Sequence, residues 1–263
     1  MSTTVQTAPL LRHDAAGIAR LTLNRPQARN ALSMALMDAL DAELVAIAAD
    51  ATVHVVVIAG AGPAFCAGHD LREMRANASE ASAEATFRLC SRMMQRVMNL
   101  PKPVIAQVHG VATAAGCQLV ASCDLAVAAE TARFATPGVN IGLFCSTPMV
   151  ALSRAVPRKH AMEMLLTGDM LAADRAREIG LVNRVVPEAE LEAATTALAR
   201  QIAAKSPLTL AIGKEAFYRQ AELPLSDAYA YASAVMTRNM MAHDAAEGID
   251  AFLNKRPPIW TGT

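Results

Sequence analysis

The chain has 263 residues, of which 53% are hydrophobic, and this length suits one α/β domain with an appendage better than two equal domains. Its 24 basic and 24 acidic side chains cancel to a formal charge of zero, which excludes a general electrostatic attraction to nucleic acid or to an anionic membrane. The five cysteines are odd in number and lack C-x-x-C spacing, so they predict free thiols in a reducing compartment. Neither a disulfide framework nor a metal site is expected.

The N-terminal stretch MSTTVQTAPLLRH has no apolar segment of signal-peptide length and predicts a cytoplasmic protein. The absence of acidic residues before Asp14 leaves a mitochondrial transit peptide as the alternative.

Alternating apolar residues predict a strand at 18–24, and NRPQARN after it is typical of a loop. Ser33 is placed to cap an amphipathic helix over 34–49. The β-branched run 54–60 is typical of a strand buried on both faces of a parallel sheet. We therefore expect a structural role for the helix, which would pack on the core.

The loop after that strand contains Gly60 and Gly62, which begin a G-x-G-x-x-G pattern. Phe65 replaces the last glycine, so the loop argues against dinucleotide binding of that type. The two glycines therefore need another explanation.

A helix is expected over 80–99, followed by the apolar run 104–129. A membrane span through this run would place His109, Gln118 and Asp124 in hydrocarbon at high cost, so we expect a strand, a short helix and a strand instead. DLAVAAE and ARFATPG indicate further short strands. Strands that alternate with helices predict an α/β fold.

From Met149 the pattern becomes helical, with one expected strand at 180–187. Helices are predicted in the C-terminal part over 188–205, 208–221 and 225–241. Met236, Met240 and Met241 lie at helical spacing, which is typical of packing in a core or between subunits.

Seven stretches occur in an order that resembles the enoyl-CoA hydratase/isomerase family, also called the crotonase superfamily. They are LNRPQARNALS, FCAGHDLREM, PVIAQVHGVATAAGCQLVASCDLAVA, ARFATPGVNIGL, MEMLLTGD, AREIGLVNRVVP and EGIDAFLNKRPPIW. Two pieces, AAGCQLVASCD and FATPGVNIGLFCSTP, resemble most closely one animal subgroup of that family.

The resemblance implies an α/β fold in which residues 1–200 form a crotonase-like spiral of ββα units. Residues 201–263 would form a C-terminal helical trimerisation region, and the assembly would be a homotrimer or a dimer of trimers. An acyl-CoA thioester would be the substrate or ligand, with no further cofactor.

By the same resemblance, the backbone N–H groups of His69 and Ala115 would hold the thioester carbonyl as an oxyanion hole. Such donors at a helix N-terminus suit a carbonyl that becomes an enolate, and the small residues beside Ala115 permit close approach of a ligand. The ring of His69 is interpreted as an exposed loop side chain without a role.

The resemblance also predicts a path for CoA. Arg29, Ala31, Ala67 and Leu71 would lie along it, and Lys255 or Arg256 would meet its phosphates, with an ordinary solvated surface as the alternative for these two charges.

Family hydratases use two glutamates, whose positions fall on Gln118 and Gly138, and the carboxylate of family isomerases falls on Ser146. Asn140 is also uncharged, so every mapped position is neutral. We interpret Gln118 either as a satisfied amide that lines a pocket or as a group that positions water or substrate. Cys117 and Cys145 are expected to be inert buried thiols, and Asp124 is expected to be structural.

Three functions remain open. The first is an enzyme that uses the oxyanion hole with little acid-base help. The second is an acyl-CoA-binding or regulatory protein without catalysis. The third is an ordinary hydratase that uses unmapped residues. A glutamine cannot accept a proton at neutral pH, and general acid-base catalysis supplies about 10²- to 10⁴-fold, so the third ranks last.

Overall fold

The computed structural model describes residues 8–263. Its main sheet has the strand order β1-β2-β3-β4-β6-β9, in which the β1–β2 pair is antiparallel and the other pairs are parallel. A smaller sheet has the order β5-β7-β8. The strands are β1 (Leu10–Ala15), β2 (Ile18–Leu23), β3 (Val55–Gly60), β4 (Val104–Val108), β5 (Val111–Thr113), β6 (Leu125–Ala129), β7 (Arg133–Ala135), β8 (Leu171–Ala172) and β9 (Arg184–Val186).

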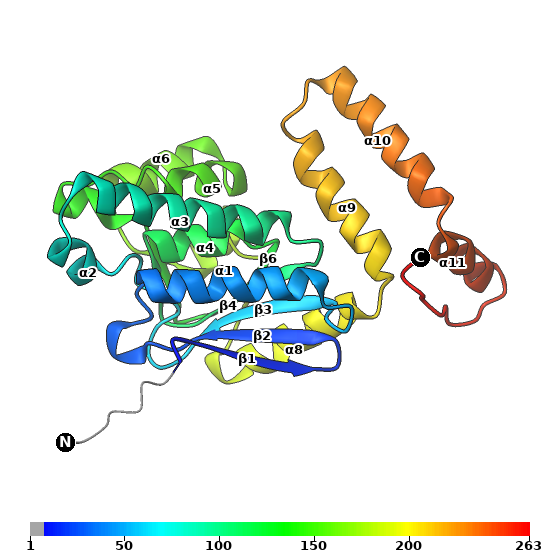
Figure 1. The fold of residues 1–263 in the computed structure, drawn as a ribbon, viewed down its shortest axis with the longest axis horizontal. Helices are drawn as coiled ribbons and strands as arrows, with labels where there is room; N and C mark the ends of the chain where they lie inside the picture. Colours follow the sequence, from blue (N-terminus) through cyan, green and yellow to red (C-terminus); the bar gives the residue numbers. More distant parts are fainter. Residues whose placement is uncertain (1–7) are drawn as a thin grey trace.

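Helices cover both faces of the main sheet (Figure 1). The helices are α1 (Met34–Ala49), α2 (Leu71–Ala76), α3 (Glu80–Asn99), α4 (Ala115–Ser122), α5 (Pro148–Ala155), α6 (Arg158–Thr167), α7 (Ala173–Glu178), α8 (Leu191–Ala203), α9 (Pro207–Gln220), α10 (Leu225–Met240) and α11 (His243–Leu253). Alternate side chains of β3 lie on opposite faces of the sheet. Val56 and Ile58 join the core with α1, α3 and α4, whereas Val55 and Val57 pack with α8.

Most predicted elements are confirmed. The Ser33 hydroxyl accepts a hydrogen bond from the N–H of Leu36 and caps α1, as expected. The run 104–129 contains two strands, β4 and β5, before α4, where one was predicted; Gly110, with φ +57°, turns the chain between them. In residues 8–263, no helix combines the length and apolarity needed to cross a membrane.

The loop glycines at 60 and 62 have a structural explanation. A Cβ on Gly60 would lie 2.6 Å from the Ala64 carbonyl oxygen, and Gly62 has φ +73°. Close packing and a left-handed turn therefore account for these residues. All five cysteines are free and buried, which confirms the prediction of free thiols.

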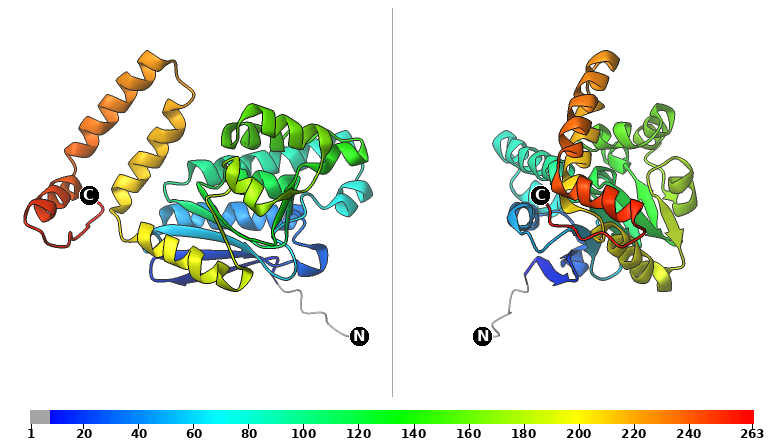
Figure 2. Two further views of the ribbon diagram at one scale, coloured as in Figure 1. Left: turned by 180° about the vertical axis from the view of Figure 1, so that it is seen from behind. Right: turned by 90° about the vertical axis from the view of Figure 1, so that its right-hand side faces the viewer.

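The C-terminal helices α9, α10 and α11 form an arm that extends from the core (Figure 1). The chain end returns toward the base of this arm (Figure 2), where the Trp260 indole N–H donates to the Ala204 carbonyl at 2.9 Å. Because α8 packs on the main sheet, the predicted division between residues 200 and 201 falls within the last turn of α8.

The predicted methionine cluster lies on the arm. Met236, Met240 and Met241 are 59%, 51% and 80% exposed, so packing in the core of one chain is wrong for them. Packing between subunits stays a prediction.

Candidate active site

Two loops that are far apart in the sequence run side by side. The Ala67 N–H donates to the Arg29 carbonyl at 3.0 Å, and the Leu32 N–H donates to the Gly68 carbonyl at 2.7 Å. This pairing brings together three residues that were predicted to lie along CoA, Arg29, Ala31 and Ala67. Leu71, the fourth, begins α2 and is 51% exposed.

The two predicted carbonyl-binding N–H groups lie at the meeting point of this loop and α4. A Cβ placed on Gly68 would be 3.5 Å from the Ala115 nitrogen, so His69 and Ala115 come from adjoining backbone segments. The His69 N–H has no backbone acceptor among residues 8–263, and Ala115 is the first residue of α4, where an N–H has no acceptor within the helix. Both donors are therefore available to a ligand.

Gly116 keeps α4 close to the loop. A Cβ at this position would lie 2.1 Å from the Cys66 carbonyl oxygen, so no larger residue fits without moving the helix. Gly116, which was expected to let a ligand approach closely, is thus required by the contact between α4 and the loop, and close approach of a ligand stays a prediction.

Ala114, which precedes α4, has φ 49° and ψ −117°, a conformation that is strained for an alanine. We expect Ala114→Gly to raise the free energy of unfolding by about 1 kcal/mol, because glycine adopts positive φ without a Cβ penalty. Urea denaturation of both proteins at one concentration measures the effect. An unchanged or lower stability would show that the methyl contact of Ala114 outweighs the backbone strain.

Gln118 lies one turn into α4, where its N–H donates to the Ala114 carbonyl at 3.0 Å. Its side chain is buried, and its Oε1 atom has no hydrogen-bond partner among the described residues. No protein group among the described residues reaches that oxygen, so both interpretations, a satisfied amide that lines a pocket and a group that positions water or substrate, stay predictions. Thr136 is also buried, and its Oγ1 atom lacks a hydrogen-bond partner among residues 8–263.

The ring of His69 is not the exposed side chain that was expected. It packs edge-on against Phe87 of α3 with ring centroids 5.6 Å apart, and both ring nitrogens are buried without a hydrogen-bond partner among the described residues. Burial lowers the pKa of His69, and the nearby Leu32 carbonyl offsets only part of this shift. The ring is therefore neutral near pH 7. Sequence alone gave no signal for this, because Phe87 lies in a different element.

Gly138 is packed so closely that it has no room for a glutamate side chain. A Cβ there would lie 2.5 Å from the Leu143 carbonyl oxygen and 2.9 Å from the Cys145 Sγ. The Cys145 thiol thus fills the space beside the second mapped glutamate position. Burial raises the pKa of Cys145, as it raises the pKa of Cys117 to about 12, so both are protonated thiols, as expected.

We expect Gly138→Glu to lower the free energy of unfolding by about 1–3 kcal/mol, because the new side chain overpacks this site. Gly213→Ala is the matched control, since a Cβ at Gly213 meets nothing within 4 Å. Thermal and urea denaturation report the difference. A Gly138→Glu protein as stable as the control variant would show that the 143–145 segment moves aside freely.

The remaining mapped positions are on the surface. Ser146 and Asn140 are exposed, and the Ser146 hydroxyl donates to the Phe144 carbonyl at 3.3 Å. Asn140 lies in the short helix η2 (Pro137–Ile141), and Ser146 follows this helix. A role for Ser146 stays a prediction.

Lys255 and Arg256 follow α11 on the arm. The two terminal guanidinium nitrogens of Arg256 donate to the Glu247 carboxylate, at 2.7 and 2.8 Å, whereas Lys255 is exposed. A CoA phosphate would have to compete with Glu247 for Arg256. Contact of either residue with CoA stays a prediction.

Sequence reasoning missed the ion pair that holds the two loops together. The Arg25 guanidinium lies 2.8 Å from the Asp70 carboxylate and also donates to the Ala31 carbonyl. Buried Asn30 adds two bonds to the Ala61 and Ala64 carbonyls. These residues fall within the matched stretches, but their pairing spans up to 45 residues and has no local sequence pattern.

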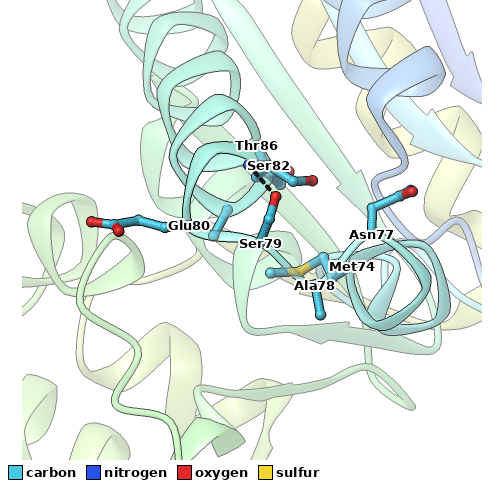
Figure 3. Close-up of a pocket in the computed structure, with 8 residues that line it drawn as sticks. Met74, Asn77, Ala78, Ser79, Glu80, Ser82 and Thr86 are labelled. Atoms are coloured by element: carbon cyan, nitrogen blue, oxygen red, sulfur yellow. Dashed lines mark hydrogen bonds between the residues drawn. The ribbon is translucent and has the colours of Figure 1, made fainter.

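A cavity of about 370 Å³ lies at the turn between α2 and α3 (Figure 3). None of the predicted site residues lines it, so it is distinct from the carbonyl position. The lining residues are Met74, Asn77, Ala78, Ser79, Glu80, Ser82, Ala83 and Thr86. Across residues 8–263, no group of three or more His, Cys, Asp or Glu side chains is arranged to hold a metal.

Comparison with known proteins agrees with this geometry. Residues 13–263 match the family model described as Enoyl-CoA hydratase/isomerase. The chain is 49% identical over 245 residues to "Enoyl-CoA hydratase domain-containing protein 3, mitochondrial" of Xenopus laevis, covering 93% of this chain and 83% of that protein. That name belongs to the animal subgroup which the two short stretches resemble.

Solved structures share the fold along almost the whole chain. An enoyl-CoA hydratase of Mycobacterium smegmatis is 54% identical, with a TM-score of 0.94 and coverage of 96% of this chain and 98% of that one. Human enoyl Coenzyme A hydratase domain-containing protein 3 is 47% identical, with a TM-score of 0.93 and coverage of 96% and 100%. The crotonase-like fold that was expected is confirmed.

Proposed function

Because the chain belongs to the enoyl-CoA hydratase/isomerase family, we propose that it binds an acyl-CoA thioester and acts on it by a route other than two-carboxylate hydration. The observation that carries the proposal is the pair of backbone N–H groups at His69 and Ala115, which come from adjoining segments. Hydrogen bonds from these donors strengthen as the carbonyl gains negative charge, and this favours enolate-like states.

The neutral surroundings of this site argue against ordinary hydration. Gln118 replaces one mapped glutamate, and Gly138 with the Cys145 thiol replaces the other. Protonated thiols and a glutamine amide do not activate water as a carboxylate does. The same neutrality favours the second candidate, an acyl-CoA-binding or regulatory protein without catalysis. A mass-spectrometric screen of thioesters for any product separates the two candidates.

Two CoA derivatives test the carbonyl site directly. Butyryl-CoA carries the thioester carbonyl, whereas the thioether S-butyl-CoA lacks it but has the same chain length. Because the carbonyl adds two hydrogen bonds, we expect butyryl-CoA to bind about tenfold tighter or better than S-butyl-CoA in calorimetry. Equal affinities would refute a carbonyl-binding role for His69 and Ala115. Failure of both to bind would refute the proposal that this is an acyl-CoA protein.

We further propose that the arm assembles the chain into a trimer or a dimer of trimers. Large apolar side chains on the arm are exposed in the single chain, which is unusual for a monomer. They include Phe217, Leu225, Tyr229, Met236, Met240, Met241, Phe252 and Leu253.

A charge on this surface is expected to prevent assembly. Phe252 is 82% exposed, and we expect Phe252→Glu to lower the mass in solution toward that of the 27.7 kDa chain, because an unpaired charge would be buried between subunits. Val45→Glu, on the exposed side of α1, is the control. Light scattering after gel filtration measures both; a wild-type protein that runs as a monomer would contradict the assembly.

The location in the cell stays a prediction. The chain was predicted to be cytoplasmic, whereas the Xenopus relative is named mitochondrial. Much of the stretch on which the transit-peptide alternative rests, residues 1–7, lies outside the described residues.

A further inference from the structure

Residues 257–263 follow α11 and return to the base of the arm, which is the connection 204–206 between α8 and α9 (Figure 2). We call this segment the strap. The Trp260 indole N–H donates to the Ala204 carbonyl at 2.9 Å, so the strap is bound to the start of that connection. A Cβ on Gly262 would lie 3.5 Å from the Cγ of Pro207, the first residue of α9. The strap thus lies against both ends of the connection from which the arm extends.

A buried carboxylate joins the strap to α11 and to the base of the arm. Asp244 is the second residue of α11, and its side chain is fully buried. One carboxylate oxygen accepts hydrogen bonds from the Thr261 N–H at 2.8 Å and from the Thr261 hydroxyl at 3.0 Å. The other accepts from the Ser206 hydroxyl at 2.6 Å and from the Gly262 N–H at 3.0 Å. Three separate parts of the chain therefore meet at one side chain.

This arrangement requires a carboxylate. Burial acts to raise the pKa of Asp244, but the hydrogen bonds from Ser206 and Thr261 outweigh it and hold the pKa below its ordinary value, so the side chain is charged near pH 7. Each oxygen accepts from a backbone N–H, and a backbone N–H cannot turn to accept instead. An asparagine would therefore point its NH₂ group at one of these N–H groups in either orientation. A substitution that keeps the size of the side chain is enough to break the arrangement.

A second contact joins the strap to α11 independently of Asp244. The Trp260 ring packs on Gly248 of α11, where a Cβ would lie 3.1 Å from the ring Cη2 atom. Next to it, the Glu247 carboxylate accepts from the Ile259 N–H at 2.8 Å. The Trp260 side chain therefore lies between α11 and the Ala204 carbonyl, and it links the helix to the base of the arm.

The strap fixes the direction of an exposed apolar face. Ile249, Phe252 and Leu253 of α11 are exposed within residues 8–263. This helix follows α10 after a connection of two residues and packs beside α9 (Figure 1). Because the strap holds α11 at the base of α9, a second copy of the chain would meet this face in one orientation.

Resting on the proposed assembly through the arm, we propose that the strap is a conformational lock that holds α11 in the orientation which a second copy of the chain recognises. When the lock opens, α11 is released and assembly is lost. The core stays folded, because α9 remains anchored to it through Lys214, which lies 2.7 Å from the Asp124 carboxylate.

Two variants open the lock separately. Asp244→Asn places an NH₂ group against a backbone N–H, and Trp260→Phe keeps an aromatic ring but removes the indole N–H. Asp174→Asn, in the first turn of α7 and outside the arm, is the control. Hydrogen exchange followed by mass spectrometry compares α11 with β3, and light scattering gives the mass in solution.

We expect exchange in α11 to become about tenfold faster or more in each lock variant, because a hydrogen bond that holds the helix is lost. Exchange in β3 is expected to stay unchanged, and the mass in solution should fall toward that of the 27.7 kDa chain. The control variant should match the wild-type protein in all three respects.

The outcomes separate the lock from the assembly. Unchanged exchange in α11 in both variants would overturn the lock, and so would faster exchange in α11 and β3 alike, which would mean that the strap stabilises the whole fold. Faster exchange confined to α11 with an unchanged mass would overturn the dependence of assembly on the lock. A monomeric wild-type protein would overturn the assembly and the recognition by a second copy, whereas exchange would still decide whether the strap holds α11.

Discussion

Lys214→Met is expected to lower the free energy of unfolding by about 3 kcal/mol, because it removes the buried cation of an ion pair and leaves the half-buried Asp124 carboxylate without it. The Lys214 ammonium lies 2.7 Å from Asp124, and its side chain is only 7% exposed. It also donates to the Val97 and Lys102 carbonyls at 3.0 Å each. One lysine of α9 thus ties the arm to the end of α3, to the turn before β4 and to the residue before β6.

The Asp124 carboxylate connects further parts of the fold besides Lys214. Its carboxylate accepts hydrogen bonds from the Val104 N–H at 2.7 Å and from the Tyr218 hydroxyl at 2.9 Å. This bonding confirms that Asp124 is structural. Since Asp124 lies two residues beyond the end of α4, loss of Lys214 is also expected to loosen α4 and weaken thioester binding.

Lys205→Met is the matched control for Lys214→Met. Lys205 is exposed on the connection between α8 and α9, and its replacement is expected to change stability by about 0.5 kcal/mol or less. Urea denaturation at one protomer concentration compares the two variants, because assembly makes stability depend on concentration. A loss below about 1 kcal/mol for Lys214→Met would show that the pair contributes little beyond its desolvation cost.

The second large effect is expected at the carbonyl site. Ala115→Pro removes one of the two donors, and for any thioester that the protein converts, the rate should fall about 10²- to 10³-fold. Ala115→Gly is the control, since it keeps the N–H and removes just the methyl. Infrared spectra of bound butyryl-CoA with ¹³C at the thioester carbonyl add a readout without turnover: the shift of that band to lower frequency should shrink in the proline variant alone.

A proline at position 115 suits the first turn of a helix, but it restricts the preceding residue, and Ala114 already has an unusual conformation. Gly68→Ala is therefore a second variant. Gly68 has φ +94°, and a Cβ there would lie 2.9 Å from the Ala114 methyl, so the change pushes the two donor segments apart. An unaltered carbonyl band in both folded variants would contradict the oxyanion hole.

The sequence predicted the parts of this fold that depend on local pattern. The Ser33 cap, the α1 helix and the buried β3 strand follow from residue spacing alone, and the order of the matched stretches carried the fold family. The sequence missed β1, because Leu10–Ala15 is a polar edge strand without a buried alternation, and it missed the short helix α2.

The unpredicted parts of the site depend on contacts between distant residues. Burial of the His69 ring requires Phe87 of α3, and the closed space at Gly138 requires the return of Cys145. The exposed methionines of the arm show the opposite case, since their spacing indicated packing while each is more than half exposed within residues 8–263. Motifs indicated the position of the candidate site, but the close packing at Gly138 and the contacts of the His69 ring were visible only in three dimensions.

The most direct test of the account is the incubation of the purified protein with crotonyl-CoA at a concentration that calorimetry shows to be saturating, followed by mass spectrometry of the CoA products. We expect crotonyl-CoA to be bound and no hydrated product, which is heavier by one water, to form above the rate without protein. Efficient formation of 3-hydroxybutyryl-CoA would contradict it, because a group other than the mapped carboxylates would then activate water beside Gln118.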